Sequence, residues 1–149
     1  YLGDADGRPR ASRAAAAPAG DALLDVGEIT AGYGASPVLK GVTLAVRRRE
    51  MVAVLGANGA GKSTLMRALS GLHRPVQGEV CFEGAALAAL PANKVVARGV
   101  VLVPEGRQVF PELSVLDNIR LGAFLRRDAD DAEVEAMLER FPRLRERLH

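Results

Sequence analysis

The sequence has no tryptophan, and aromatic residues make up only 4% of its 149 residues. A folded core must therefore be built mainly from Leu, Val and Ala, and the 48% hydrophobic content predicts that such a core exists. Cys81 is the only cysteine, which excludes an internal disulfide, and its strand-like surroundings predict a small buried side chain. No apolar run approaches the ~20 residues that a membrane-spanning helix needs.

Strong net charge is also lacking. The chain carries 20 basic and 18 acidic residues, a balance that gives no argument for a nucleic-acid partner. The two histidines, His73 and His149, cannot form a metal cluster without further ligands. Residues 1–21 are rich in Ala, Arg and Pro, which predicts a disordered linker or the tail of a preceding domain. Residues 22–149 are then the expected domain.

The hydrophobic pattern predicts strands over residues 23–29, 38–46, 51–55, 79–82 and 100–103. The runs 51–55 and 100–103 are continuous, which is typical of strands that are buried on both faces. In the alternating run 38–46, we expect one face to carry Val38, Val42, Leu44 and Val46.

Helices are predicted over residues 62–72, 91–98 and 130–141, with another beginning near Arg143. Leu65, Ala68, Leu69 and Leu72 should share one face of the first helix, which Gly71 and Pro75 should end. Ser114 is expected to cap a further helix, because Asp117 follows three residues later in a pattern close to a capping box.

The most informative segment is a glycine-rich loop. Residues 56–64 fit the phosphate-binding pattern G-x-x-x-x-G-K-[ST] without mismatch. The glycines let backbone N–H groups converge on phosphates, and the following helix directs its positive end at the anion. Lys62 is expected to reach the β- and γ-phosphates of ATP, and Ser63 to ligate Mg²⁺. The predicted ATP-contacting residues are Gly56, Asn58, Gly59, Ala60, Gly61, Lys62, Ser63 and Thr64. The alternative is an ordinary glycine-rich turn between a strand and a helix.

Kinases and GTPases share such a loop, so the flanking sequence must decide the class. From about Leu23 to its end, the chain resembles the ATP-binding cassette (ABC) ATPases. The resemblance implies an α/β P-loop NTPase fold of the ABC ATPase type with an antiparallel β subdomain. In that family an aromatic residue ahead of the loop stacks on adenine. Tyr33, within Thr-Ala-Gly-Tyr-Gly at residues 30–34, matches that position.

Glu105 falls where the resemblance places the Q-loop, the hinge between the ATPase core and a helical subdomain. The wider family usually has Gln there, close to Mg²⁺ and the attacking water. A carboxylate could also ligate Mg²⁺. Pro-Glu-Gly-Arg at 104–107 and Phe-Pro-Arg-Leu at 141–144 resemble the ATPase subunits of branched-chain amino acid importers. An alternative interpretation, that 100–105 is a Walker B strand, requires an unusually short spacing from Lys62 and is interrupted by Pro104.

An ABC signature, a Walker B strand ending in Asp-Glu and a switch His are not found in the 149 residues. The resemblance therefore implies a cassette truncated before these elements, with ATP sandwiched between two cassettes in the active state. Because catalysis requires that closed site, we expect the chain alone to hydrolyse little or no ATP.

The resemblance implies several partners: a second ABC ATPase subunit in a homo- or heterodimer, membrane permease subunits and, indirectly, a solute-binding protein. It also implies a peripheral location on the cytoplasmic face of the inner (plasma) membrane. Residues 1–3, Tyr-Leu-Gly, resemble the tail of a companion ATPase and suggest two ATPases fused in tandem. Two other functions stay open: a small-molecule kinase, which would need a lid and a substrate-binding acid or Arg cluster, and a non-catalytic nucleotide-binding module.

Overall fold

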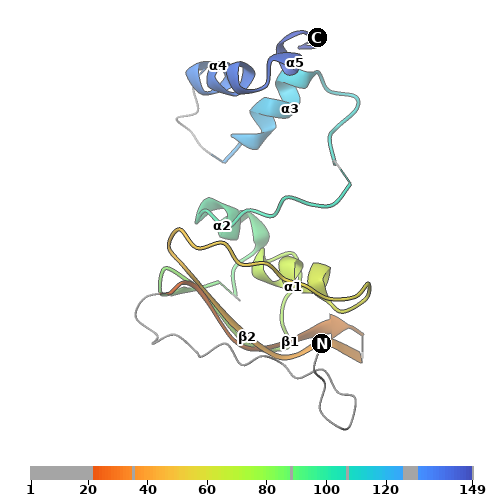
Figure 1. The fold of residues 1–149 in the computed structure, drawn as a ribbon, viewed down its shortest axis with the longest axis vertical. Coiled ribbons are helices and arrows are strands. Elements are labelled where there is room, and N and C mark those ends of the chain that lie inside the picture. Colours follow the sequence, from red (N-terminus) through yellow and green to blue (C-terminus); the bar gives the residue numbers. More distant parts are fainter. Residues whose placement is uncertain (1–21, 35, 88, 107, 126–130, 149) are drawn as a thin grey trace. The chain divides into compact units, whose positions relative to one another are not determined.

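The computed structural model describes residues 22–34, 36–87, 89–106, 108–125 and 131–148. It divides into two compact units, Tyr1–Leu102 and Val103–His149, which are described separately. Figure 1 shows the order of their elements along the chain. The predicted linker at 1–21 lies outside the described residues.

The first unit contains a sheet of four strands: β1 (Ala22–Tyr33), β2 (Ser36–Arg47), β3 (Gln77–Phe82) and β4 (Ala85–Ala86). Their order across the sheet is β2-β1-β3-β4, and every neighbouring pair is antiparallel. Consecutive β1 and β2 form a hairpin, as expected for antiparallel strands joined by a short turn. The antiparallel β subdomain that the sequence predicted is confirmed.

Two bulges change which side chains face the core. Ile29 pairs with Val42 and Ala31 with Leu39, so one extra residue lies in β2 near Gly41, whose φ is 61°. Another extra residue lies in β1 near Glu28, whose φ is 47°. A bulge shifts the inward alternation by one residue. As a result Leu39 is buried whereas Val38 is 41% exposed, so the prediction that Val38 shares a face with Val42 and Leu44 is wrong.

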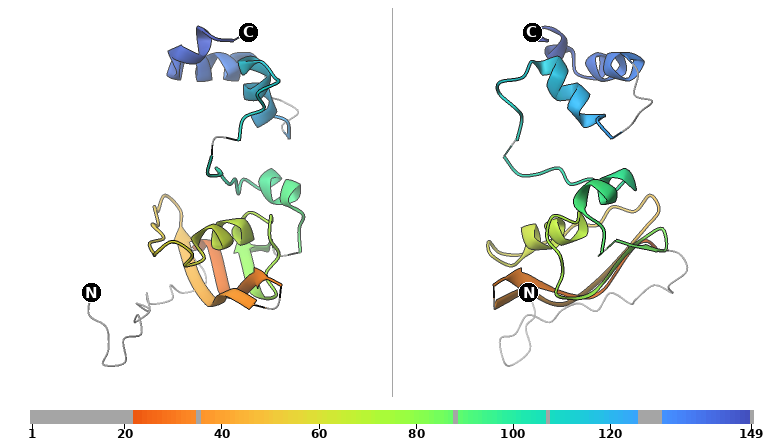
Figure 2. Two further views of the ribbon diagram at one scale, coloured as in Figure 1. Left: turned by 90° about the vertical axis from the view of Figure 1, so that its right-hand side faces the viewer. Right: turned by 180° about the vertical axis from the view of Figure 1, so that it is seen from behind.

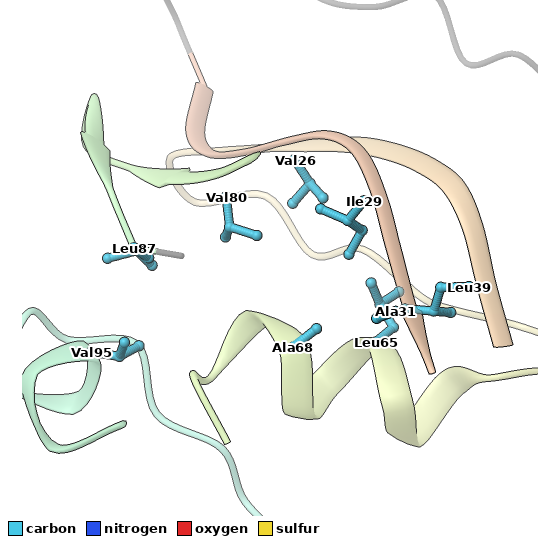
Figure 3. Packing of buried hydrophobic residues seen from close by; sticks show 9 residues of the cluster. All are labelled: Val26, Ile29, Ala31, Leu39, Leu65, Ala68, Val80, Leu87 and Val95. Atoms are coloured by element: carbon cyan, nitrogen blue, oxygen red, sulfur yellow. The ribbon is translucent and has the colours of Figure 1, made fainter. Parts of the chain in front are cut away.

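Helices α1 (Lys62–Leu69) and α2 (Ala92–Ala97) belong to the same unit. Figure 2 shows α1 lying against the sheet. Leu65 and Ala68 of α1 face the buried side chains of the strands, as Figure 3 shows in close view. The core cluster consists of Val26, Ile29, Ala31, Leu39, Leu65, Ala68, Val80, Leu87 and Val95. The first helix is shorter than predicted and leaves Leu72 61% exposed, because the backbone turns at Gly71 with a φ of 75°.

The segments 51–55 and 100–103 are not strands, contrary to the sequence prediction. Met51 and Leu55 are 96% and 90% exposed, and Val103 is 88% exposed. A strand forms only when its backbone pairs with a neighbouring strand. Among the described residues, no strand pairs with either segment. Both runs are apolar enough for a buried parallel strand, but neither has a paired neighbour within the described ranges.

The second unit is helical, with α3 (Val115–Gly122), α4 (Asp131–Arg140) and α5 (Pro142–Arg145). The Ser114 side chain caps α3 by accepting a hydrogen bond of 3.1 Å from the Asp117 N–H, which confirms the predicted cap. Arg145 of α5 pairs with Glu135 of α4. None of the helices in the described part of the chain has the length and apolarity that crossing a bilayer demands.

Candidate functional site

The glycine-rich loop leads directly into α1. Residues 56–60 are exposed, Gly61 is buried as the N-cap residue, and the helix begins at Lys62. Within the described part of the chain, no backbone carbonyl or capping side chain accepts from the N–H groups of Lys62, Ser63 and Thr64. Unsatisfied N–H groups at a helix start carry partial positive charge. The loop therefore presents several donors suited to an anion.

Gly61 is fixed by its contacts as well as by its backbone. Its φ is 95°, and a Cβ placed there would lie 2.9 Å from Leu39 Cδ2 and 3.0 Å from Val38 Cγ1. Any side chain at this position would push the loop away from β2. Gly59 also has a positive φ, 84°, but a Cβ there would meet nothing within 4 Å. Of these two glycines, only Gly61 brings the loop close to the sheet.

The Lys62 ammonium folds back over the loop. Its Nζ donates to the Gly56 carbonyl at 2.7 Å and to the Ala57 carbonyl at 2.8 Å. These bonds hold the loop curled around the start of α1, and the Ala60 N–H donates to the same Ala57 carbonyl at 3.2 Å. An ammonium has three donors, so one N–H of Lys62 is left for an additional acceptor.

The two hydroxyl residues after Lys62 have different surroundings. Ser63 is exposed at the first turn of α1, whereas Thr64 is only 6% exposed. The Ser63 hydroxyl is therefore accessible to a ligand, as a metal-ligating residue must be. Asn58 and Ala60 are exposed in the loop itself.

Tyr33 ends β1 and is 53% exposed. Two residues contact it, Arg67 in α1 and His73 just beyond that helix. The Arg67 Nη1 donates to the Tyr33 Oη at 3.0 Å, and the His73 ring lies 4.8 Å from the Tyr33 ring between centroids, at a tilt of 44°. Donation by Arg67 lowers the pKa of the Tyr33 phenol, aided by the Thr64 hydroxyl and opposed by partial burial. Sequence reasoning missed Arg67 and His73, because neither belongs to a recognisable motif.

Glu105 belongs to the second unit and is exposed. It is followed by Gly106, whose φ is 84°, in the segment that leads to α3. Farther along, Asn118 accepts from the Phe110 N–H and donates to the Phe110 carbonyl, both at 2.9 Å. Because Ser63 and Glu105 lie in different units, their joint role as Mg²⁺ ligands stays a prediction. In the described ranges, no group of three His, Cys, Asp or Glu side chains could hold a metal ion.

A family model described as "ABC transporter" matches residues 39–148, most of the chain. This chain belongs to the ABC transporter family. The match begins in β2 and ends in the second unit, so it includes both the loop and Glu105.

Relatives of this ABC family member differ in what their names say they transport. The chain is 39% identical over 127 residues to the high-affinity branched-chain amino acid transport ATP-binding protein BraG of Pseudomonas aeruginosa, covering 84% of this chain and 54% of BraG. It is 37% identical to the ribose import ATP-binding protein RbsA 1 of Burkholderia pseudomallei, covering 81% of this chain and 14% of that protein. The chain thus spans about half of BraG and a smaller part of RbsA 1.

Solved structures agree with the fold. One described as an ATP-binding subunit of an ABC transporter is 36% identical, with a TM-score of 0.73, over 85% of this chain and 52% of that one. Another, a dimeric ATP-binding cassette in a post-hydrolysis state with ADP and Pi, is 25% identical, with a TM-score of 0.64, over 72% of this chain and 50% of that one. The α/β fold of the ABC ATPase type is thereby confirmed for this ABC family member.

Proposed function

We propose that this chain is part of the ATP-binding subunit of an ABC importer, in which residues 22–149 form a partial nucleotide-binding domain. The observation that carries the proposal is the start of α1, where free N–H groups, the Lys62 ammonium and the exposed Ser63 hydroxyl lie together. These are the donors and the metal ligand that the polyphosphate of ATP requires.

In this proposal the third N–H of Lys62 bonds the β- and γ-phosphates, while the N–H groups at the start of α1 bond the remaining oxygens. The residues assigned to ATP in this loop are Gly56, Asn58, Gly59, Ala60, Gly61, Lys62, Ser63 and Thr64, and Tyr33 is assigned to adenine. Ser63 and Glu105 would hold Mg²⁺, which neutralises charge between the phosphates when bound. The exposed position of both side chains is compatible with that role.

We assign the whole protein to ATP-driven import of branched-chain, or similarly hydrophobic, amino acids. The name of BraG supports this solute, whereas other relatives are named for ribose, arabinose and spermidine or putrescine. The importer would include a second ABC ATPase subunit, which could be identical, different or fused in tandem. It would also include membrane permease subunits, to which a solute-binding protein delivers the solute. The ATPase would lie peripherally on the cytoplasmic face of the membrane.

The first test is calorimetric titration of the chain with Mg²⁺–ATP. We expect Lys62→Ala to weaken binding by about 100-fold or more, because it removes a charge-assisted contact to two phosphates. Lys94→Ala, at an exposed lysine in α2, is the matched control and should leave the affinity unchanged. Absence of any affinity in the unaltered protein would contradict the proposal.

The second test concerns turnover. The 149 residues contain no ABC signature or Walker B Asp-Glu, so we expect phosphate release from ATP by this chain alone to stay at background. Turnover that disappears in Lys62→Ala would overturn this expectation and would show that this chain by itself suffices for catalysis.

The third test addresses the solute. Cells lacking the gene should lose uptake of radiolabelled leucine and regain it with the unaltered gene but not with Lys62→Ala. Uptake of ribose and spermidine in the same cells is the control. Loss of either of those instead of leucine would reassign the solute and leave the ATP-binding proposal intact.

A further inference from the structure

Tyr33 is hydrogen-bonded to the helix that begins at the phosphate-binding loop. Arg67, near the end of α1, donates to the Tyr33 Oη at 3.0 Å. His73, just beyond α1, places its ring 4.8 Å from the Tyr33 ring. The His73 N–H also donates to the Arg67 carbonyl at 3.0 Å, so the two residues are tied to each other. We call Arg67 and His73 the Tyr33 brace.

Hydrogen bonding by the imidazole does not explain where the His73 side chain lies. Its Nε2 is shielded from solvent and has no hydrogen-bond partner in the described part of the chain. Such an atom disfavours the folded state, since its bond to water is lost without replacement. What His73 contributes here is an aromatic surface against Tyr33. The tight turn before it supports this placement, since a Cβ on Gly71 would lie 2.9 Å from Val95 Cγ2.

The Tyr33 brace also links the phosphate-binding loop to Tyr33 through a single helix. Lys62 and Arg67 lie in the same helix, in which each residue advances about 1.5 Å along the axis. The phosphate end and the tyrosine end are therefore joined by one rigid element. The exposed strand end at Tyr33 would otherwise leave the ring free to change rotamer.

We propose that Arg67 and His73 are positioning residues that hold the Tyr33 ring, from the phosphate-binding helix itself, in the orientation in which it receives a nucleobase. The inference rests on the proposed ATP binding and extends it to residues outside the loop. It assigns neither residue to the phosphates. Removing either one should weaken nucleotide binding only through the base.

A spectroscopic experiment tests the brace without any nucleotide. The chain has two tyrosines and no tryptophan, so Tyr1→Phe makes Tyr33 the only phenol. In that background, near-ultraviolet absorbance reports ionisation of Tyr33 directly. Arg67→Met should raise the pKa of Tyr33 toward its ordinary value, because the guanidinium that lowers it is gone. An unchanged titration would overturn the assigned contact.

The decisive experiment compares Mg²⁺–ATP with Mg²⁺–tripolyphosphate, which lacks a base. Arg67→Met and His73→Leu should each weaken ATP binding by about three- to tenfold, since binding must then order a freely rotating ring. Both variants should bind tripolyphosphate as the unaltered protein does. His73→Phe, which keeps an aromatic ring, should bind ATP as tightly as the unaltered protein. Arg74→Met is the control, because it removes an equal charge from the residue next to His73. Arg74 donates to the Ala89 carbonyl, and its replacement should leave the affinity for both ligands unchanged.

The outcomes separate the two proposals. Equal losses for ATP and tripolyphosphate would overturn the positioning role and assign Arg67 to the phosphates or to stability. Unchanged ATP affinity in Arg67→Met and His73→Leu would also overturn it, while leaving ATP binding intact. If the unaltered protein bound neither ligand, the proposed function itself would fail.

Discussion

Residues 22–33, which form β1, and residues 51–55 carry similar strand signals but differ in structure. The first segment is a strand with neighbours on both sides, and Val26, Ile29 and Ala31 are fully buried. The second is exposed and unpaired with any described strand, although it is a continuous apolar run. Hydrophobicity makes a segment suitable for a sheet, but only hydrogen-bonding neighbours make it a strand.

The largest effect should come from truncating the buried segment and the exposed one in the same way. Ile29→Ala should lower the free energy of unfolding by about 2–5 kcal/mol, because it leaves a cavity at a fully buried position. Leu55→Ala, at a side chain that is 90% exposed, should change it by less than about 0.5 kcal/mol. Urea unfolding followed by circular dichroism measures both. Similar losses would show that residues 51–55 are buried in solution.

The contact between the exposed loop and β2 should give the next largest effect. Gly61→Ala places a Cβ 2.9 Å from Leu39 at a positive φ, so we expect a loss of about 1–3 kcal/mol and weakened ATP binding. Gly59→Ala is the matched control, because it meets no neighbour and carries only the backbone strain. Equal effects in thermal unfolding would mean that the contact with β2 does not constrain the loop.

A smaller effect should follow from removing the cap of α3, which needs no sheet. Ser114→Ala should cost about 1 kcal/mol, because the Asp117 N–H loses its acceptor. Ser114→Asp keeps an acceptor and should retain most of the stability. Amide hydrogen exchange over residues 115–118 provides the readout. Unaltered protection in Ser114→Ala would show that packing, and not the cap, holds this turn.

The smallest effect should come from the turn that joins β2 to the exposed segment. Arg49 has a φ of 62°, in the left-handed region that glycine adopts most easily. Arg49→Gly should therefore raise the free energy of unfolding by up to about 1 kcal/mol, since glycine adopts this conformation without steric cost. Arg48 pairs with Glu83 and should be left unaltered in this variant. A decrease in the melting temperature would contradict the assignment of strain to Arg49.

Local signals predicted most of what formed. The cap at Ser114, the turn at Gly71 and the start of α1 at Lys62 all follow from short-range chemistry. The inward positions of β2 could not be predicted, because the bulge at Gly41 turns Leu39 instead of Val38 toward the core. A bulge depends on how two strands pair, and hydrophobic alternation in one strand does not specify it.

The candidate site divides in the same way. The loop residues were found by motif, since the spacing of Gly56, Gly61 and Lys62 follows from phosphate geometry. Arg67 and His73 carry no such pattern, and only the approach of β1 to α1 places them beside Tyr33.

The sequence alone determined the phosphate-binding pattern, the order of most helices and strands, and the family resemblance, because these depend on residues close together in the chain. Only the tertiary structure decided which apolar runs become strands, which face of β2 is buried and what holds Tyr33. Those outcomes depend on contacts between distant segments, and a side chain's partner there is set by the fold rather than by its neighbours in sequence.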